Sequence, residues 1–173
     1  MANNTLTPIN RSNLFYSEED FQFETDLMVD YMEEDINQTV VLYRVDRTRT
    51  NINVISQSSI DGIVFEAPVE LPCMYKIEES QLKSYDKKTS NGVYAINGNL
   101  TVWMMPKVLE KYETDIMRGD YIGVQIETNR MVYFVVTDDG KVNTANEYNI
   151  GAYKTGWRVI KCSPTSDYEF KGQ

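Results

Sequence analysis

The stretch Tyr121–Gly140, YIGVQIETNRMVYFVVTDDG, decides the fold class. It holds two runs rich in β-branched and aromatic residues, Tyr121–Ile126 and Met131–Thr137. Such residues favour strands, and the polar segment Glu127–Arg130 between the runs has the composition of a turn. The Asp-Asp-Gly at 138–140 supplies a second turn signal. The stretch therefore predicts an antiparallel meander.

Further strand-like runs lie on both sides of this meander. Asn-Gly at 97–98 stands between two of them and is a strong local hairpin signal. Pro106–Glu113 has a helix-forming composition with Pro near its start, so we expect a short helix there. About seven to nine short strands at close spacing predict a mainly β fold, a small antiparallel β-barrel or sandwich. Lys141–Asn146 is the third run of the meander, and the runs outside it are Thr39–Val45, Asn51–Ser56, Gly62–Phe65, Cys73–Ile77, Val93–Ile96, Leu100–Met104 and Trp157–Cys162.

The chain divides into four predicted segments. Residues 1–16 are polar and nearly uncharged, and they predict an extended N-terminal arm. Residues 17–36 predict an acidic amphipathic helix, residues 37–165 the β-barrel domain, and residues 166–173 a polar C-terminal tail. The first residues are polar, so we expect no secretion signal, and no apolar run in the sequence approaches the roughly 20 residues that a membrane span needs.

The predicted helix has a clear start and an unusual end. Ser17 can cap its N-terminus, and the acids directly after Ser17 suit the positive end of the helix dipole. The acids at 33–35 lie where that dipole disfavours negative charge, so either the helix stops early or nearby cations compensate. Apolar residues recur at helical spacing and predict one broad apolar face. They are Phe21, Leu27, Met28, Tyr31, Met32 and Ile36.

The net charge of −9 is concentrated in this helix. Residues 1–35 carry one Arg against nine acidic residues, a net charge of −8, and the rest of the chain carries −1. Such a segment is a solvated face, a surface that meets a basic partner, or the lining of a channel. The candidate partner-facing or channel-facing acids are Glu18, Glu19, Asp20, Glu24, Asp26, Asp30, Glu33, Glu34 and Asp35.

Several classes of chemistry find no support in the sequence. The chain has no histidine, which removes the usual general base and the commonest metal ligand. Cys73 and Cys162 lie far apart and predict two buried or half-buried free thiols rather than a zinc or redox site. The helix acids are consecutive and point outward, whereas a carboxylate-dependent hydrolase needs carboxylates that converge on a pocket. We therefore expect no catalytic residue, no metal site and no cofactor.

Three short motifs have simpler interpretations than their functional ones. The Asp-Asp-Gly at 138–140 lacks the remaining ligands of a calcium loop and predicts a turn. The Arg-Gly-Asp at 118–120 directly precedes a strand and predicts a turn in which Gly119 takes a special backbone angle. Arg44, Arg47 and Arg49 form a basic loop too small for a nucleic-acid site. This loop is either solvated or a contact to acidic groups of a neighbouring copy.

Four segments resemble tailed-bacteriophage neck proteins, which are also called head-closure, stopper or head–tail connector ring proteins. The resemblance rests on the order of the elements over residues 39–165 and is strongest at Asp115–Thr137. The segments are Thr39–Asp46 (TVVLYRVD), Phe65–Pro72 (FEAPVELP), Asp115–Thr137 (DIMRGDYIGVQIETNRMVYFVVT) and Gly151–Pro164 (GAYKTGWRVIKCSP).

The resemblance implies a non-enzymatic virion protein, assembled in the bacterial host cytoplasm. Its small β-barrel would form a cyclic ring of about twelve copies beneath the portal. The ring would join the DNA-filled head to the tail through portal, neck and tail partners, and would let DNA pass without specific binding. Loops and terminal arms would carry the contacts. Two alternatives stay open: a tail-completion or tail-terminator protein of the same virion, and a cytoplasmic acidic binding module.

Overall fold

The computed structural model describes residues 17–50, 62–78, 98–127, 130–141 and 156–165. The helical elements are α1 (Glu18–Tyr31), the π-helical turn η1 (Met32–Ile36) and α2 (Pro106–Lys111). The strands are β1 (Thr39–Tyr43), β2 (Val69–Pro72), β3 (Met74–Ile77), β4 (Leu100–Met104), β5 (Tyr121–Glu127), β6 (Arg130–Asp138) and β7 (Arg158–Pro164).

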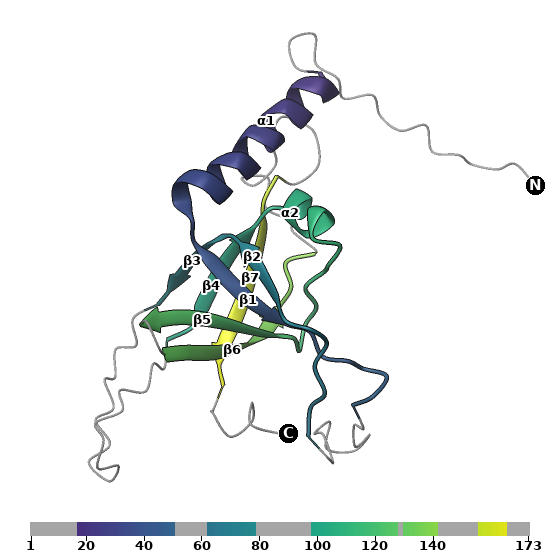
Figure 1. The fold of residues 1–173 in the computed structure, drawn as a ribbon, viewed down its shortest axis with the longest axis vertical. Helices are drawn as coiled ribbons and strands as arrows, with labels where there is room; N and C mark the ends of the chain where they lie inside the picture. The colour runs from purple at the N-terminus through teal and green to yellow at the C-terminus, as the bar shows by residue number, and fades with distance from the viewer. Residues whose placement is uncertain (1–16, 51–61, 79–97, 128–129, 142–155, 166–173) are drawn as a thin grey trace, which may run out of the picture.

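The seven strands form one antiparallel sheet in the order β2-β1-β5-β6-β7-β4-β3. The two edge strands, β2 and β3, are joined by Cys73 alone, so the chain itself links both edges of the sheet. The backbone N–H of Cys73 donates to the carbonyl of Gln38 at 2.9 Å, which fixes this corner beside the start of β1. The sheet therefore curls into a nearly closed barrel (Figure 1), and the predicted mainly β fold is confirmed.

The first two strands of the predicted meander are the hairpin of β5 and β6, in which Ile122 pairs with Phe134 and Gly123 with Tyr133. The two strands extend to Glu127 and Arg130, which the prediction had assigned to the turn. β6 then pairs with β7, which follows it only after a long stretch of chain.

Alternating burial along the strands builds the core inside the barrel. In β1 the buried positions are Val40 and Leu42, and β4 buries every second residue from Leu100 to Met104. Phe134 of β6 is the largest fully buried side chain. A period of two residues is what a sheet with one face on a core requires.

A second, smaller cluster of aromatic rings lies on the outer face of the sheet. Tyr43 contacts Phe65 and Tyr133 edge-on, with ring centroids 6.1 and 5.8 Å apart, and Phe65 contacts Tyr121 at 5.5 Å. Gly123 makes room for these rings, since a Cβ there would lie 3.1 Å from the Tyr43 ring. The cluster adds edge-to-face packing to the burial inside the barrel.

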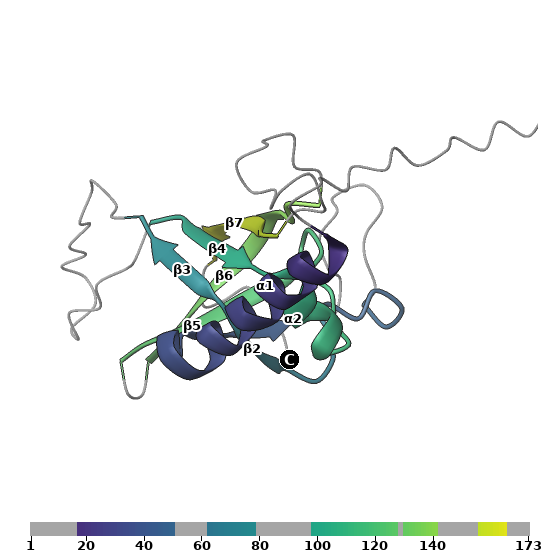
Figure 2. The ribbon, with the colours of Figure 1, turned by 90° about the horizontal axis from the view of Figure 1, so that it is seen from above.

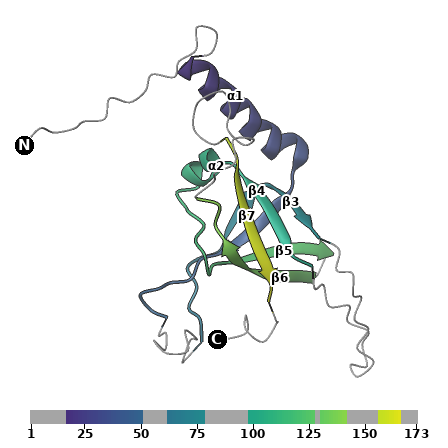
Figure 3. The same ribbon diagram turned by 180° about the vertical axis from the view of Figure 1, so that it is seen from behind.

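Both helices lie at the same end of the barrel (Figures 1 and 2). Seen from behind, β7 runs away from this helical end toward β6, whereas the antiparallel β4 runs toward it and leads into α2 (Figure 3). Val29 and Met32 of the α1–η1 helix join the hydrophobic core. The helix predicted over residues 17–36 is confirmed, as is the short helix at Pro106.

Some predicted elements lie outside the described residues or differ from the structure. The runs Asn51–Ser56 and Val93–Ile96, almost all of Lys141–Asn146, the arm 1–16 and the tail 166–173 are outside. A strand over Gly62–Phe65 is wrong, because Gly62 has φ +94° and only Phe65 makes a bridge, to Val45. The positive φ takes Gly62 itself out of the β region.

Candidate functional site: the acidic helix and the arginine loop

Helix α1 begins with the predicted cap. The Asp20 backbone N–H donates to Ser17 Oγ at 3.2 Å, and the Ser17 backbone N–H donates to Asp20 Oδ2 at 2.8 Å. These reciprocal bonds form a capping box, with Asp20 in the place where Glu or Gln is more usual. The hydrogen bonds from Ser17 hold the pKa of Asp20 below its ordinary value. At least this acid has a structural role in its own helix.

The helix buries only part of the predicted apolar face, together with two residues that the prediction left out. Thr25, Val29 and Met32 are the buried positions, with Met28 and Ile36 packed beside them. Leu27 and Tyr31, which the prediction placed on the same face, are 58% and 56% exposed. Positions 27 and 29 differ by about 200° around a helix, so one barrel end cannot cover both.

An exposed apolar stripe runs along the opposite side of α1. It consists of Phe23, Leu27 and Tyr31, at spacings of four residues, with Phe23 69% exposed. Residues four apart on a helix lie one above the other on one face. Leu27 and Tyr31 also line a groove of about 460 Å³ whose polar residues are Asp30, Glu34 and Asp35. We call Phe23, Leu27 and Tyr31 the α1 stripe.

Two acids of the helix bind lysines of α2. Asp26 forms an ion pair with Lys107, and Glu33 forms one with Lys111 at 2.7 Å. The hydrogen bond to Glu33 raises the pKa of Lys111. These contacts tie α1 to α2, and Lys111 supplies the cation that the acidic C-terminal end of the helix was expected to need. The remaining helix carboxylates are mostly solvent-facing: Glu18, Glu19, Asp30, Glu34 and Asp35 are exposed, and Glu24 is half-buried.

The helix ends through a π-helical turn followed by a left-handed residue. Residues 32–36 form η1, and Asn37 has φ +49° and donates its backbone N–H to the Met32 carbonyl at 3.1 Å. Asn tolerates this conformation better than most residues. The chain therefore turns sharply from the helix into β1.

The three arginines of the predicted basic loop each contact a group of their own chain. Arg44 lies 3.4 Å from Glu66, and Arg49 lies 3.1 Å from Asp46. Arg47 donates to the carbonyl of Arg118 at 2.9 Å. Their charge is thus largely matched locally, although the Arg49 side chain is 75% exposed. A contact of this loop with a neighbouring copy stays a prediction.

The Arg-Gly-Asp tripeptide is a structural turn. Gly119 has φ +93°, as predicted, and Asp120 is only 2% exposed. Asp120 accepts the backbone N–H groups of Met117 at 2.8 Å and Val45 at 3.1 Å. Burial raises the pKa of Asp120, and these two donors offset only part of that effect. The buried Asp120 side chain therefore holds the turn against the chain that follows β1, and it is inaccessible to an adhesive receptor.

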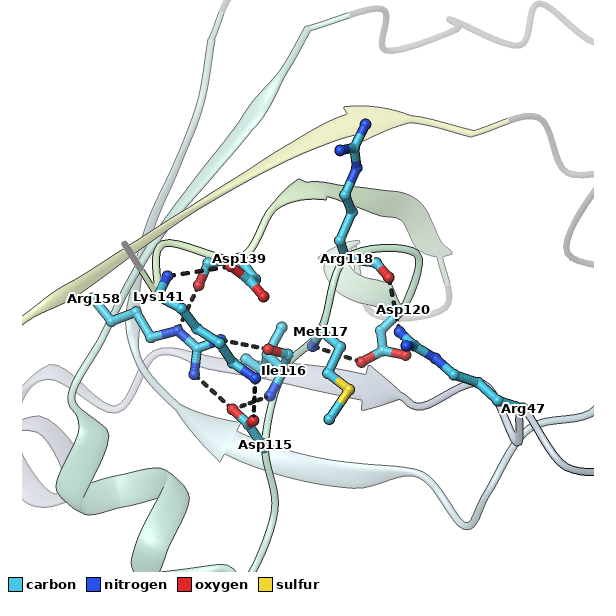
Figure 4. A network of polar contacts seen from close by, with 9 residues as sticks. All are labelled: Arg47, Asp115, Ile116, Met117, Arg118, Asp120, Asp139, Lys141 and Arg158. Carbon is cyan, nitrogen blue, oxygen red and sulfur yellow. Dashed lines mark hydrogen bonds and ion pairs between the residues drawn. The ribbon is translucent and has the colours of Figure 1, made fainter. Parts of the chain in front are cut away.

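The sequence did not reveal a polar clamp centred on Arg158 (Figure 4). Arg158 of β7 is buried and donates to Asp115 Oδ1 at 2.6 Å, to the Asp139 carbonyl at 2.5 Å and to the Ile116 carbonyl. Lys141 binds the other oxygen of Asp115 at 2.6 Å. We call Arg158, Asp115 and Lys141 the Arg158 clamp. The signal for it was an Arg in register with the inward positions Ile160 and Cys162, since a buried Arg needs partners.

The turn at 138–140 and the cysteines also have structural roles. The backbone N–H of Gly140 donates to Asp138 Oδ1 at 3.1 Å, and Gly140 has φ +65°, as a turn requires. In the described part of the chain, no group of three or more Cys, Asp or Glu side chains is arranged to hold a metal ion. Cys73 and Cys162 are buried free thiols, as predicted, and burial raises the pKa of each to about 12.

α1 presents the stripe and its acids at one end of the barrel, while the Arg158 clamp and Asp120 hold the loops. None of the helices in the described ranges has the length and apolar character needed to cross a bilayer. No protein-family model matches the chain, and no curated protein or solved structure matches it either.

Proposed function

We propose that this chain is a structural virion protein of the tailed-phage neck. In this proposal, copies of the chain form a ring that links portal to tail and leaves a channel for DNA. The support is twofold: the segments of residues 39–165 that resemble neck proteins, and the fold that this resemblance implies, a small β-barrel, which the chain has.

The observation that carries the proposal is that the negative charge lies on the N-terminal helix and not on the β-barrel. The barrel body is close to neutral, whereas α1 and η1 hold nine acids at one end of it. A ring of such subunits would repeat this acidic element around its axis. Facing the lumen, the acids would repel DNA phosphates and keep the channel from binding DNA. Facing outward, they would meet a basic partner.

The structure refines which acids should be altered to test this role. Glu33 pairs with Lys111, so a charge reversal there also removes a contact between α1 and α2. Glu34 and Asp35 are exposed. E34K/D35K should therefore leave the isolated fold intact while impairing the joining of heads to tails in particles produced from the altered genome. Normal yields of infectious particles from E34K/D35K would count against an assembly or channel role for this acidic end.

A second candidate is an acidic binding module that acts as a monomer, and the exposure of most helix carboxylates favours it. Light scattering separates the two candidates. The ring subunit should form a high-mass species when mixed with the portal protein of the same genome. A chain that stays monomeric in that mixture supports the module instead. The tail-completion alternative predicts binding to tail tubes rather than to portal.

A further inference from the structure

We propose that the α1 stripe is a docking site for a basic amphipathic helix of another protein. This inference deepens the proposed function, because it names the chemistry of the partner that the acidic helix binds. It rests on the proposed function only in placing that partner in the phage neck. The starting observation is that Phe23, Leu27 and Tyr31 remain 69%, 58% and 56% exposed although α1 is packed on the barrel through its other side.

The shape of the surface favours a helical occupant. The stripe spans the nine residues from Phe23 to Tyr31, about 12 Å along the helix axis. The backbone of α1 already uses its hydrogen bonds internally, so an added strand would find no main-chain partners along it. An amphipathic helix, in contrast, meets such a stripe through side chains spaced three and four residues apart. The groove beside Leu27 and Tyr31, about 460 Å³ in volume, offers space for one or two such side chains.

The charge around the stripe selects among possible occupants. Asp30, Glu34 and Asp35 line the same groove, and Glu18 and Glu19 are exposed in the first turn of the helix. A nucleic acid or an anionic lipid surface would be repelled. A partner that carries Lys or Arg on both sides of an apolar face would satisfy the stripe and the carboxylates together.

The same charges disfavour a second copy of this chain. Two α1 helices packed stripe to stripe would bring their carboxylates together. Arg44, Arg47 and Arg49, which the sequence suggested as the complementary loop, are engaged with Glu66, with the Arg118 carbonyl and with Asp46 of their own chain. The chain outside residues 1–35 has a net charge of −1, so it offers no basic excess. A different, basic protein fits better.

The test measures binding of a synthetic peptide to the full chain by fluorescence anisotropy. The probe is a helix of about 18 residues with Leu along one face and Lys and Arg on the other. A scrambled peptide of the same composition is its control. The stripe variant is L27Q/Y31Q, because Gln keeps a high helix propensity. The matched control is I126Q, since Ile126 is another exposed apolar residue, 39% exposed, on β5. Circular dichroism establishes that each variant is folded.

We expect the wild-type chain and I126Q to bind the probe alike, and L27Q/Y31Q to bind at least about tenfold more weakly. The scrambled peptide should also bind at least about tenfold more weakly, because it lacks an apolar face. E34Q/D35Q should reduce both the affinity and its dependence on salt. Failure of the probe to bind, or equal binding of the scrambled peptide or of L27Q/Y31Q, would overturn the proposal.

Two further results would assign the stripe to another occupant. Self-association of the wild-type chain that L27Q/Y31Q abolishes would make a second copy the occupant. Binding to vesicles of anionic phospholipid that depends on Leu27 and Tyr31 would make it a membrane. Ring assembly with portal is measured separately, so a ring that forms while the probe fails refutes only this inference, and the reverse result refutes only the neck assignment.

Discussion

Replacing Arg158 by Met is expected to destabilise the fold more than any single surface change. Met has a similar length but donates no hydrogen bond. The change leaves the carbonyls of Asp139 and Ile116 without this donor, and leaves Asp115 with Lys141 and the backbone N–H of Ile116. Removing one partner of a buried ion pair costs about 3–5 kcal/mol. Because the Asp115 side chain is 39% exposed and keeps Lys141, we expect about 2–4 kcal/mol here.

The assay is urea unfolding followed by circular dichroism at pH 7. The urea concentration at the midpoint of unfolding should fall, while the slope of the free energy of unfolding against urea concentration stays the same, since the fold is unchanged. In a thermal scan the loss corresponds to a melting temperature lower by roughly 4–16 °C. R158K keeps the charge but lacks the planar fork that reaches three acceptors, so it should lie between wild type and R158M. Lys161 is exposed on the same strand, and K161M is the matched control.

The pH dependence of the clamp follows from the pKa of Asp115. Burial acts to raise this pKa, but hydrogen bonds and charge from Lys141 and Arg158 outweigh burial and lower it. The carboxylate therefore stabilises the fold fully above its ordinary pKa of 3.8, and that contribution is lost as pH falls through the lower folded value. The difference in the free energy of unfolding between wild type and D115N should therefore become smaller as the pH falls over this range.

The R158M prediction is refuted if the free energies of unfolding of R158M and wild type at pH 7 differ by less than about 0.5 kcal/mol.

Three more changes test the structural roles of other residues. D120A should lower the free energy of unfolding by about 2–4 kcal/mol, because two backbone N–H groups lose their acceptor; a loss below about 0.5 kcal/mol would contradict this role. G140A should cost more than about 2 kcal/mol, since φ is +65° and a Cβ would lie 2.2 Å from the Val159 carbonyl oxygen; unchanged urea unfolding would refute this. Cys73 and Cys162, with pKa values of about 12 against an ordinary 9.0, should react with iodoacetamide at pH 8 about a thousandfold more slowly than in urea, and equal rates would show that they are accessible.

Local sequence signals predicted the elements whose causes are themselves local. The β-branched and aromatic runs in Tyr121–Thr137, with polar residues between them, predicted the β5–β6 hairpin, and Ser17 predicted the start of α1. Pro106 marked the start of α2. Each of these depends on neighbours within a few residues, which is the range over which turn chemistry, capping and periodicity act.

Contacts between distant segments could not be predicted from the sequence. Arg158 and Asp115 are 43 residues apart, and nothing near either residue names the other as its partner. The closure of the barrel at Cys73 depends on the order of seven strands, which periodicity does not specify. The face of α1 that is buried depends on where the barrel ends, so the apolar pattern alone could not separate Val29 from Leu27.

We propose that this chain is a ring subunit at the junction of head and tail. Cryo-EM of the neck of particles made from the genome that encodes the chain tests it most directly. The account predicts a closed ring at the single tail vertex whose repeating density fits the seven-stranded barrel, with α1 carrying its acids at one end. Purified particles that contain no copies of the chain, or that carry them anywhere other than at this junction, would contradict it.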